Sequence, residues 1–144
     1  MSDVVNQLSV ILADTYALYL KTQNYHWHVR GPQFISLHQL FETHYRELAE
    51  AVDGIAERIV ILGFKAPATF KDLEHLKSLK DGDSHGSSND MLQELAQDHG
   101  ILLREIKKAI MGAQKSNDEG TVSLLSDRIS AHEKAHWMLT AFFE

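Results

Sequence analysis

Residues 34–62, FISLHQLFETHYRELAEAVDGIAERIVIL, repeat apolar side chains every three or four positions, which is the pattern of one helix face. Side chains of metal-binding types follow the same period: His38 and Glu42 are four residues apart, and so are Asp53 and Glu57. On an ideal helix these four positions lie at about 0°, 40°, 60° and 100°, so they share a face. A helix gains no stability from such a row of carboxylates and imidazoles, whereas a metal site needs these ligands.

The two pairs on this face are too far apart to bind one ion within a single chain. His38 and Asp53 are separated by fifteen residues, which is about 22 Å at a rise of about 1.5 Å per residue. Two copies of the helix that cross antiparallel on a two-fold axis would bring His38 and Glu42 of one copy to Asp53 and Glu57 of the other. His26, near the end of the preceding helical pattern, could join the first pair. These mixed ligands suit iron, zinc or manganese.

Simpler interpretations stay open for the same residues. The helix also carries Arg46, Glu47 and Glu50, so part of the row could be a solvated charged face. His26, taken alone, could be a packed or capping histidine rather than a ligand.

The rest of the chain predicts more helices and no strand with a two-residue period. A polar, glycine-rich segment at 80–88 separates two pairs of long helical patterns, and prolines occur only at apparent breaks. The long helices are predicted at 3–29, 34–62, 89–114 and from the turn at 116–120 to residue 142, with a short helix at 69–77. This order predicts an all-α, ferritin-like four-helix bundle, formed by a single domain over residues 1–144.

Composition excludes several classes of function. The chain has 144 residues, of which 44% are apolar, and its net charge is −6. It contains no cysteine, which excludes disulfides and thiolate zinc sites. The negative charge argues against nucleic acid as a partner, and no apolar run is long enough for a bilayer. We expect a soluble cytoplasmic protein without a secretory signal.

Residues 132–136, HEKAH, match the H-E-x-x-H motif of zinc proteases. The motif lies so close to the end of the sequence that no third ligand can follow, and no sheet is predicted to form a substrate cleft. The unit Glu133-x-x-His136 also occurs in bundle-core di-iron sites, but these need a second copy that the sequence lacks. Neither chemistry is therefore favoured. The expected packed face leaves His132 and His136 on a flank and consists of Ala131, Ala135 and Leu139.

Three segments resemble the Dps proteins, the DNA-binding proteins from starved cells, which are miniferritins. Residues 24–32, NYHWHVRGP, are similar to the motif at the end of the first helix of that family. Residues 34–63 have its histidine before an acidic stretch, followed by VDGIAER, and residues 135–139, AHWML, fit its last helix. The resemblance covers essentially the whole chain, and the ligand spacing is its most specific part.

The resemblance implies a ferroxidase centre between two-fold-related subunits of a hollow dodecamer. By the family pattern, His26 and His38 come from one subunit, and Asp53 and Glu57 come from its partner. Glu42 stands where the family usually has aspartate, one turn after the second histidine. The implied activity is oxidation of Fe(II), typically by hydrogen peroxide, with storage of a ferric mineral and protection against oxidative stress. Zinc is an alternative occupant of the site in purified protein.

The resemblance also raises questions beyond the metal centre. Tyr25 and Trp27 flank His26 and could intercept stray oxidising equivalents or simply pack. Acidic residues near the start of the last helix line the iron pores of the family. The candidates here are Asp118, Glu119 and Asp127. Asp118 and Glu119 could instead be favourable charges at a helix N-terminus.

The sequence has no lysine-rich terminal tail, so we expect DNA binding to be weak or absent. The alternative function is a non-catalytic structural or nucleoid-associated shell, in which Glu42 marks a weakened metal site.

Overall fold

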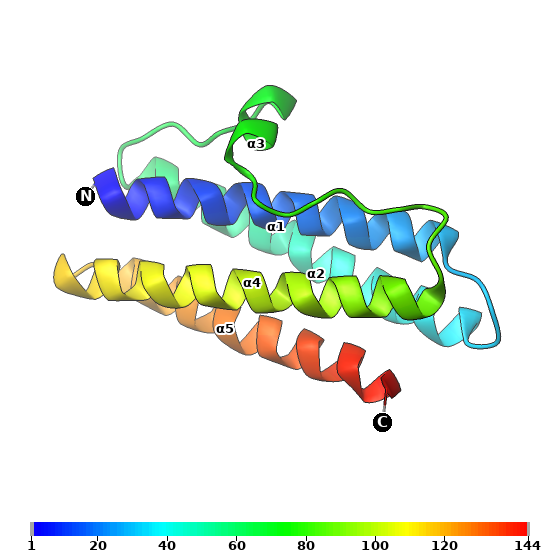
Figure 1. Ribbon diagram of the computed structural model, residues 1–144. Coiled ribbons are helices and arrows are strands. Elements are labelled where there is room, and N and C mark those ends of the chain that lie inside the picture. Colours follow the sequence, from blue (N-terminus) through cyan, green and yellow to red (C-terminus); the bar gives the residue numbers. More distant parts are fainter. Residues whose placement is uncertain (1, 144) are drawn as a thin grey trace.

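The computed structural model describes residues 2–143, and four long helices form its bundle (Figure 1). A short helix, α3, lies outside the bundle in the connection between the second and third long helices. The elements are α1 (Ser2–His28), α2 (Phe34–Ile61), α3 (Phe70–Leu76), α4 (Ser88–Lys115), α5 (Glu119–Thr140) and the 3₁₀ turn η1 (Ala141–Phe143). The prediction of an all-α four-helix bundle with a short extra helix is confirmed.

Local sequence explains where the helices begin and end. The Ser87 hydroxyl accepts a hydrogen bond from the backbone N–H of Asp90, and Thr69 caps α3 in the same way. Gly63, just beyond α2, has φ of 94°, in the left-handed region that a residue with a side chain rarely adopts. Capping serine and terminating glycine therefore act at the ends that the sequence predicted.

The core is formed by the apolar stripes of the four long helices. Burial of one such leucine, isoleucine or phenylalanine stabilises the fold by about 1.5–3 kcal/mol relative to exposure. None of the described helices is long and apolar enough to cross a membrane. The largest fully buried apolar side chains are Phe41, Leu8, Ile11, Leu12, Leu18, Leu37, Leu48, Ile55, Ile59, Met91 and Leu95.

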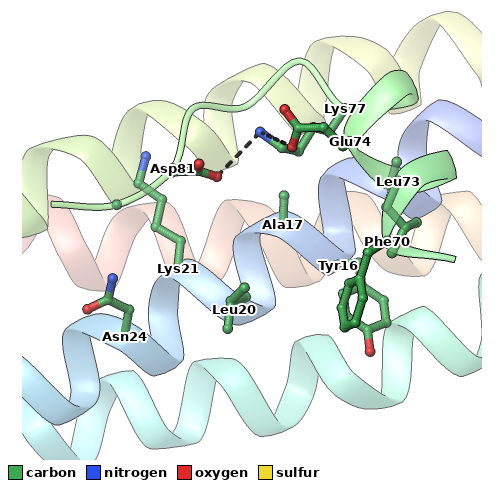
Figure 2. Close-up of a pocket in the computed structure, with 12 residues that line it drawn as sticks. Tyr16, Ala17, Leu20, Lys21, Asn24, Phe70, Leu73, Glu74, Lys77 and Asp81 are labelled. Atoms are coloured by element: carbon green, nitrogen blue, oxygen red, sulfur yellow. Dashed lines mark ion pairs between the residues drawn. The ribbon is translucent and has the colours of Figure 1, made fainter. Parts of the chain in front are cut away.

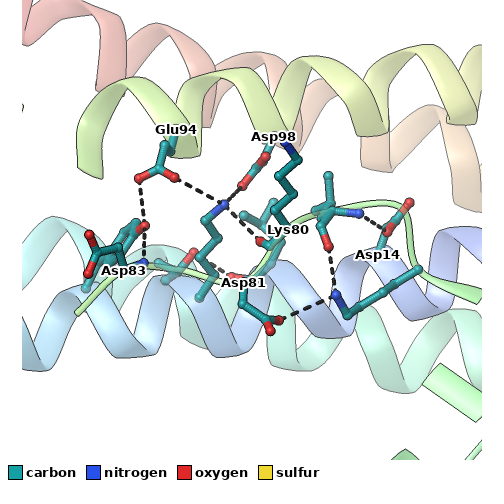
Figure 3. Close-up of polar contacts among 12 residues, drawn as sticks. Asp14, Lys80, Asp81, Asp83, Glu94 and Asp98 are labelled. Carbon is teal, nitrogen blue, oxygen red and sulfur yellow. Dashed lines mark hydrogen bonds and ion pairs between the residues drawn. The ribbon is translucent and has the colours of Figure 1, made fainter. Parts of the chain in front are cut away.

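The connection from α3 to α4 runs along the bundle and is tied to it by polar contacts (Figure 3). The buried Asp14 carboxylate accepts hydrogen bonds from the Ser78 backbone N–H at 2.7 Å and from the Ser78 hydroxyl at 2.8 Å. Lys21 donates to the Lys80 carbonyl at 3.0 Å and pairs with Asp98 on α4 at 2.9 Å. These contacts provide hydrogen-bond partners for backbone N–H and carbonyl groups of the connection, which lie outside any helix.

Candidate metal centre

His26 on α1 and His38 on α2 form a stacked pair next to the turn between the two helices. Their ring centroids are 3.8 Å apart, with an angle of 11° between the ring planes. The Nδ1 atom of each ring lies 2.7 Å from the backbone carbonyl oxygen of the other residue. Because a carbonyl can only accept, each Nδ1 carries the proton, and each Nε2 retains the lone pair that binds a metal. Such a bond to the far nitrogen is the usual way in which a protein orients a metal-binding histidine.

Glu42 lies beside this pair, one turn after His38 on α2. Its Oε1 atom is 3.8 Å from His26 Nε2, while its Oε2 atom accepts a hydrogen bond from Arg46 Nε at 2.9 Å. The hydrogen bond from Arg46 lowers the pKa of Glu42, which keeps this exposed carboxylate ionised. The structure therefore places Glu42 next to the histidine pair, but these three side chains do not converge on one point, and Arg46 already occupies one carboxylate oxygen.

Asp53 and Glu57 do not join these three residues within one chain. Both side chains are exposed on α2, and the helical rise places Asp53 about 22 Å from His38. Among the residues that the structure describes, no three histidine, aspartate or glutamate side chains converge to hold a metal ion. The single chain thus presents two separate sets of candidate ligands on one helix.

The prediction that His132 lies on a flank of the last helix is wrong, because its side chain is fully buried in the bundle. Its Nε2 atom accepts a hydrogen bond from Arg128 at 3.0 Å. A neutral imidazole has one proton, so His132 Nδ1 carries it and donates to His99 Nδ1 at 2.8 Å. Both His132 nitrogens are therefore engaged, and the HEKAH motif does not present the paired ligands of a zinc protease.

His132 belongs to a buried histidine cluster that also contains His44 on α2 and His99 on α4. Burial, and to a smaller extent the charge of the Arg128 guanidinium, lower the pKa of His132 to about 3. Burial also lowers the pKa of His44 to about 4 and holds that of His99 well below its usual range. All three rings are therefore neutral at pH 7. The three histidines lie too far apart in the sequence for helical periodicity to show that they are in contact.

Arg128 closes the cluster on the side of α2. Its guanidinium makes a two-point contact with the carboxylate of Glu47, for which a solvated face was one of the open interpretations. Glu47 remains half exposed, and its carboxylate neutralises the buried arginine. The spacing of Arg128 and His132, four residues on one helix, was the sequence signal only for the hydrogen bond between these two residues.

Asp118 caps α5, which is the alternative to a pore role that the sequence offered for it. Its carboxylate accepts hydrogen bonds from the backbone N–H of Thr121 at 3.2 Å and from Arg58 at 2.6 Å. Only 9% of Asp118 is exposed, which supports the helix-terminus interpretation of this residue. Glu119 and Asp127 are exposed, and the pore role stays a prediction for these two.

Tyr25 and Trp27 lie in opposite environments although both flank His26. Tyr25 is fully buried, and its hydroxyl donates to Glu94 on α4 at 2.8 Å. Trp27 is 59% exposed, so packing within this chain does not account for it.

The chain is similar in sequence and in fold to known proteins. A ferritin-like domain matches residues 5–144. The chain is 39% identical to DNA protection during starvation protein 2 of Bacillus anthracis over 139 residues, which cover 96% of this chain and 95% of that protein. The chain belongs to the Dps family. Dps from Bacillus brevis, a solved structure, superposes with a TM-score of 0.96 at 34% identity, covering 99% of this chain and 96% of that one.

A second Dps structure connects the fold to a chemical class. Dps from Vibrio cholerae O1, described as a member of a broad superfamily of ferritin-like diiron-carboxylate proteins, matches with a TM-score of 0.95 and 31% identity. The match covers 99% of this chain and 90% of that one. The family assignment made from the sequence motifs is therefore confirmed over nearly the whole chain.

Proposed function

We propose that this protein oxidises Fe(II) and stores the ferric product as a mineral inside a dodecameric shell. The observation that carries the proposal is the His26–His38 pair, whose Nδ1 atoms are held by carbonyl groups so that both Nε2 atoms are free to bind iron. The description of the Vibrio cholerae relative as a ferritin-like diiron-carboxylate protein supports iron as the metal. Nitrogen and carboxylate ligands without thiolate suit labile iron.

The centre becomes complete only when two subunits meet. An antiparallel crossing of two α2 helices on a two-fold axis would place Asp53 and Glu57 of the partner subunit opposite His26 and His38. The exposure of both carboxylates in the single chain leaves them free for this contact. Each pair of subunits then forms two equivalent centres.

The ligands favour a two-electron reaction with hydrogen peroxide. Carboxylates are hard anions and stabilise ferric over ferrous iron, which makes oxidation more favourable. Two ferrous ions together supply both electrons: 2 Fe²⁺ + H₂O₂ + 2 H⁺ gives 2 Fe³⁺ + 2 H₂O. No hydroxyl radical leaves the centre in this reaction, so the shell removes iron and peroxide together and protects against oxidative stress.

Anaerobic addition of ferrous iron and peroxide tests this function through ferric absorbance and iron loading. His26→Ala and His38→Ala should slow oxidation by about 10- to 100-fold, the usual cost of a disturbed metal site. His75→Ala is the matched control, because His75 is exposed on α3. Size-exclusion chromatography must show an intact shell in each variant. An unchanged oxidation rate in both site variants would show that the site is assigned wrongly.

A second candidate function is a structural shell without ferroxidase activity. The observation that favours it is the Glu42–Arg46 ion pair, which occupies a carboxylate where the family usually has the shorter aspartate. A wild-type shell that oxidises and loads iron no faster than buffer would support this function. Recovery of activity in Arg46→Gln would show that the arginine weakens the centre.

A further inference from the structure

Glu42 presents its two carboxylate oxygens to different partners. Oε1 lies 3.8 Å from His26 Nε2, the nitrogen that is free to bind a metal, whereas Oε2 accepts the hydrogen bond from Arg46 Nε at 2.9 Å. A carboxylate can bind a metal through one oxygen or through both. While the contact with Arg46 lasts, Glu42 has only one oxygen left for an ion beside the histidine pair.

Arg46 is held in this position from a second side. The Cζ atom of its guanidinium lies 5.4 Å from the centre of the Tyr45 ring, within the range of a cation–π contact. The Tyr45 ring in turn packs against His26, with ring centroids 5.2 Å apart. Two contacts therefore fix the guanidinium beside the candidate metal centre, although 67% of the arginine side chain is exposed.

The partner of Arg46 distinguishes this ion pair from an ordinary one on the surface. An ion pair between residues four apart on an exposed helix adds little to the stability of the fold. Lys77, for example, pairs with Glu74 at 3.5 Å and with Asp81 at 3.4 Å, beside the groove between α1 and α3 and away from the candidate ligands (Figure 2). Arg46 instead binds the carboxylate that lies next to the histidine pair.

We propose that Arg46 determines which divalent cations the centre accepts. This inference rests on the proposed function. By occupying Oε2, Arg46 limits Glu42 to one oxygen, so the two imidazole nitrogens supply most of the bonds that this subunit can form to an ion. Imidazole suits Fe²⁺ and Zn²⁺, whereas Ca²⁺ takes about six to eight oxygen ligands and often binds both oxygens of a carboxylate.

Such selectivity would keep the centre open to iron. Ca²⁺ and Mg²⁺ have no further oxidation step, so a centre that holds either of them carries out no oxidation. Both ions bind through oxygen and gain most from a carboxylate with two free oxygens. Arg46 withholds the second oxygen of Glu42 and therefore disfavours these ions more than it disfavours Fe²⁺.

Calorimetric titration of the intact shell with Co²⁺, in the absence of peroxide, tests this selectivity. Co²⁺ stands in for oxygen-sensitive Fe²⁺, which it follows in the order of affinities for such ligands. The titration is repeated in the presence of Ca²⁺, so that the fall in apparent Co²⁺ affinity gives the Ca²⁺ affinity of the same centre. Wild type should bind Co²⁺ much more tightly than Ca²⁺, and His26→Ala should weaken Co²⁺ binding by about tenfold or more.

The ratio of the Co²⁺ affinity to the Ca²⁺ affinity is the decisive quantity. In Arg46→Gln it should fall by about three- to tenfold, the value of one added hydrogen-bond-like contact to a carboxylate oxygen. Arg46→Lys keeps a charge that can pair with Glu42 four residues away, so its ratio should stay near that of wild type. Arg104→Gln removes the same charge from the exposed surface of α4 and is the matched control. In a Glu42→Gln background, Arg46→Gln should leave the ratio unchanged, because no carboxylate oxygen is left to release.

The contrary results have separate meanings. If wild type binds no Co²⁺, or if His26→Ala binds it as tightly as wild type, the site of the proposed function is wrong and the selectivity inference falls with it. If Co²⁺ binding depends on His26 but Arg46→Gln keeps the wild-type ratio, only the inference about Arg46 is overturned. An equal rise in both affinities also overturns it, because that is the effect of removing a positive charge without freeing an oxygen.

Discussion

The buried histidine cluster predicts that the fold loses stability in mild acid. The pKa of His132 is about 3 in the folded chain, against an ordinary value of 6.5, because its ring is buried beside Arg128. Unfolded chains therefore bind a proton at His132 between these pH values, whereas folded chains do not. Stability contributed by the neutral ring is complete above pH 6.5 and falls as the pH falls toward 3.

The size of the effect follows from the linkage of proton binding to unfolding. Each pH unit below 6.5 costs about 1.4 kcal/mol for one such histidine, so pH 4.5 costs roughly 3 kcal/mol at His132 alone. His44 and His99 are shifted in the same direction and add to the loss. Total stabilities are about 5–15 kcal/mol, so the cluster can account for acid unfolding.

Thermal unfolding between pH 4.5 and 8, at fixed protein concentration, measures this dependence. His132→Gln keeps an amide oxygen for Arg128 and an N–H for His99, but it cannot take up a proton. Its midpoint should fall less steeply with acid than that of wild type, by the slope of one proton. His75→Gln, on the exposed surface of α3, should follow wild type. Identical acid slopes in wild type and His132→Gln would refute the reasoning.

Three further predictions concern other parts of the chain. Asp118→Ala should lower the free energy of unfolding by about 1–2 kcal/mol in a denaturant titration, because the cap of α5 and the partner of Arg58 are lost. Slower iron uptake without lower stability would instead indicate a pore role. Burial and Asp14 raise the pKa of Glu105 to about 8, so its ionisation opposes folding as the pH rises. At pH 9 the free energy of unfolding of Glu105→Gln should therefore exceed that of wild type by on the order of 1 kcal/mol, which raises its thermal midpoint. A midpoint below that of wild type contradicts this prediction. A gel-shift assay at about 150 mM salt should show no stable DNA complex, since the chain has a net charge of −6. A stable shift at that salt concentration would contradict this expectation.

Helix α2 shows which properties of the fold and the site the local sequence pattern predicts. Its apolar period predicted the buried face that contains Leu37, Leu48 and Ile55, and its length predicted the separation of His38 from Asp53. Both properties depend only on helical geometry, which residues close in the sequence determine. The placement of candidate ligands along α2 could therefore be predicted from the spacing of these residues alone.

His132 shows where local pattern fails. Apolar spacing on α5 favoured a packed face of alanine and leucine, because a lone histidine costs free energy when it is buried without partners. Its partner His99 lies thirty-three residues earlier, on another helix, and Arg128 is itself neutralised from α2. Only the tertiary arrangement shows that His132 finds hydrogen-bond partners at both of its ring nitrogens. The reciprocal bonds between His26 and His38 escaped prediction for the same reason.

Those reciprocal bonds make the two histidines one mutational unit. Loss of either ring removes a stacking partner and one of the two carbonyl contacts that join the end of α1 to the start of α2. Single replacements should therefore each remove the shared stacking contact, so the double replacement should cost less than the sum of the two. A change at one position is then expected to cost less once the other histidine has already been replaced.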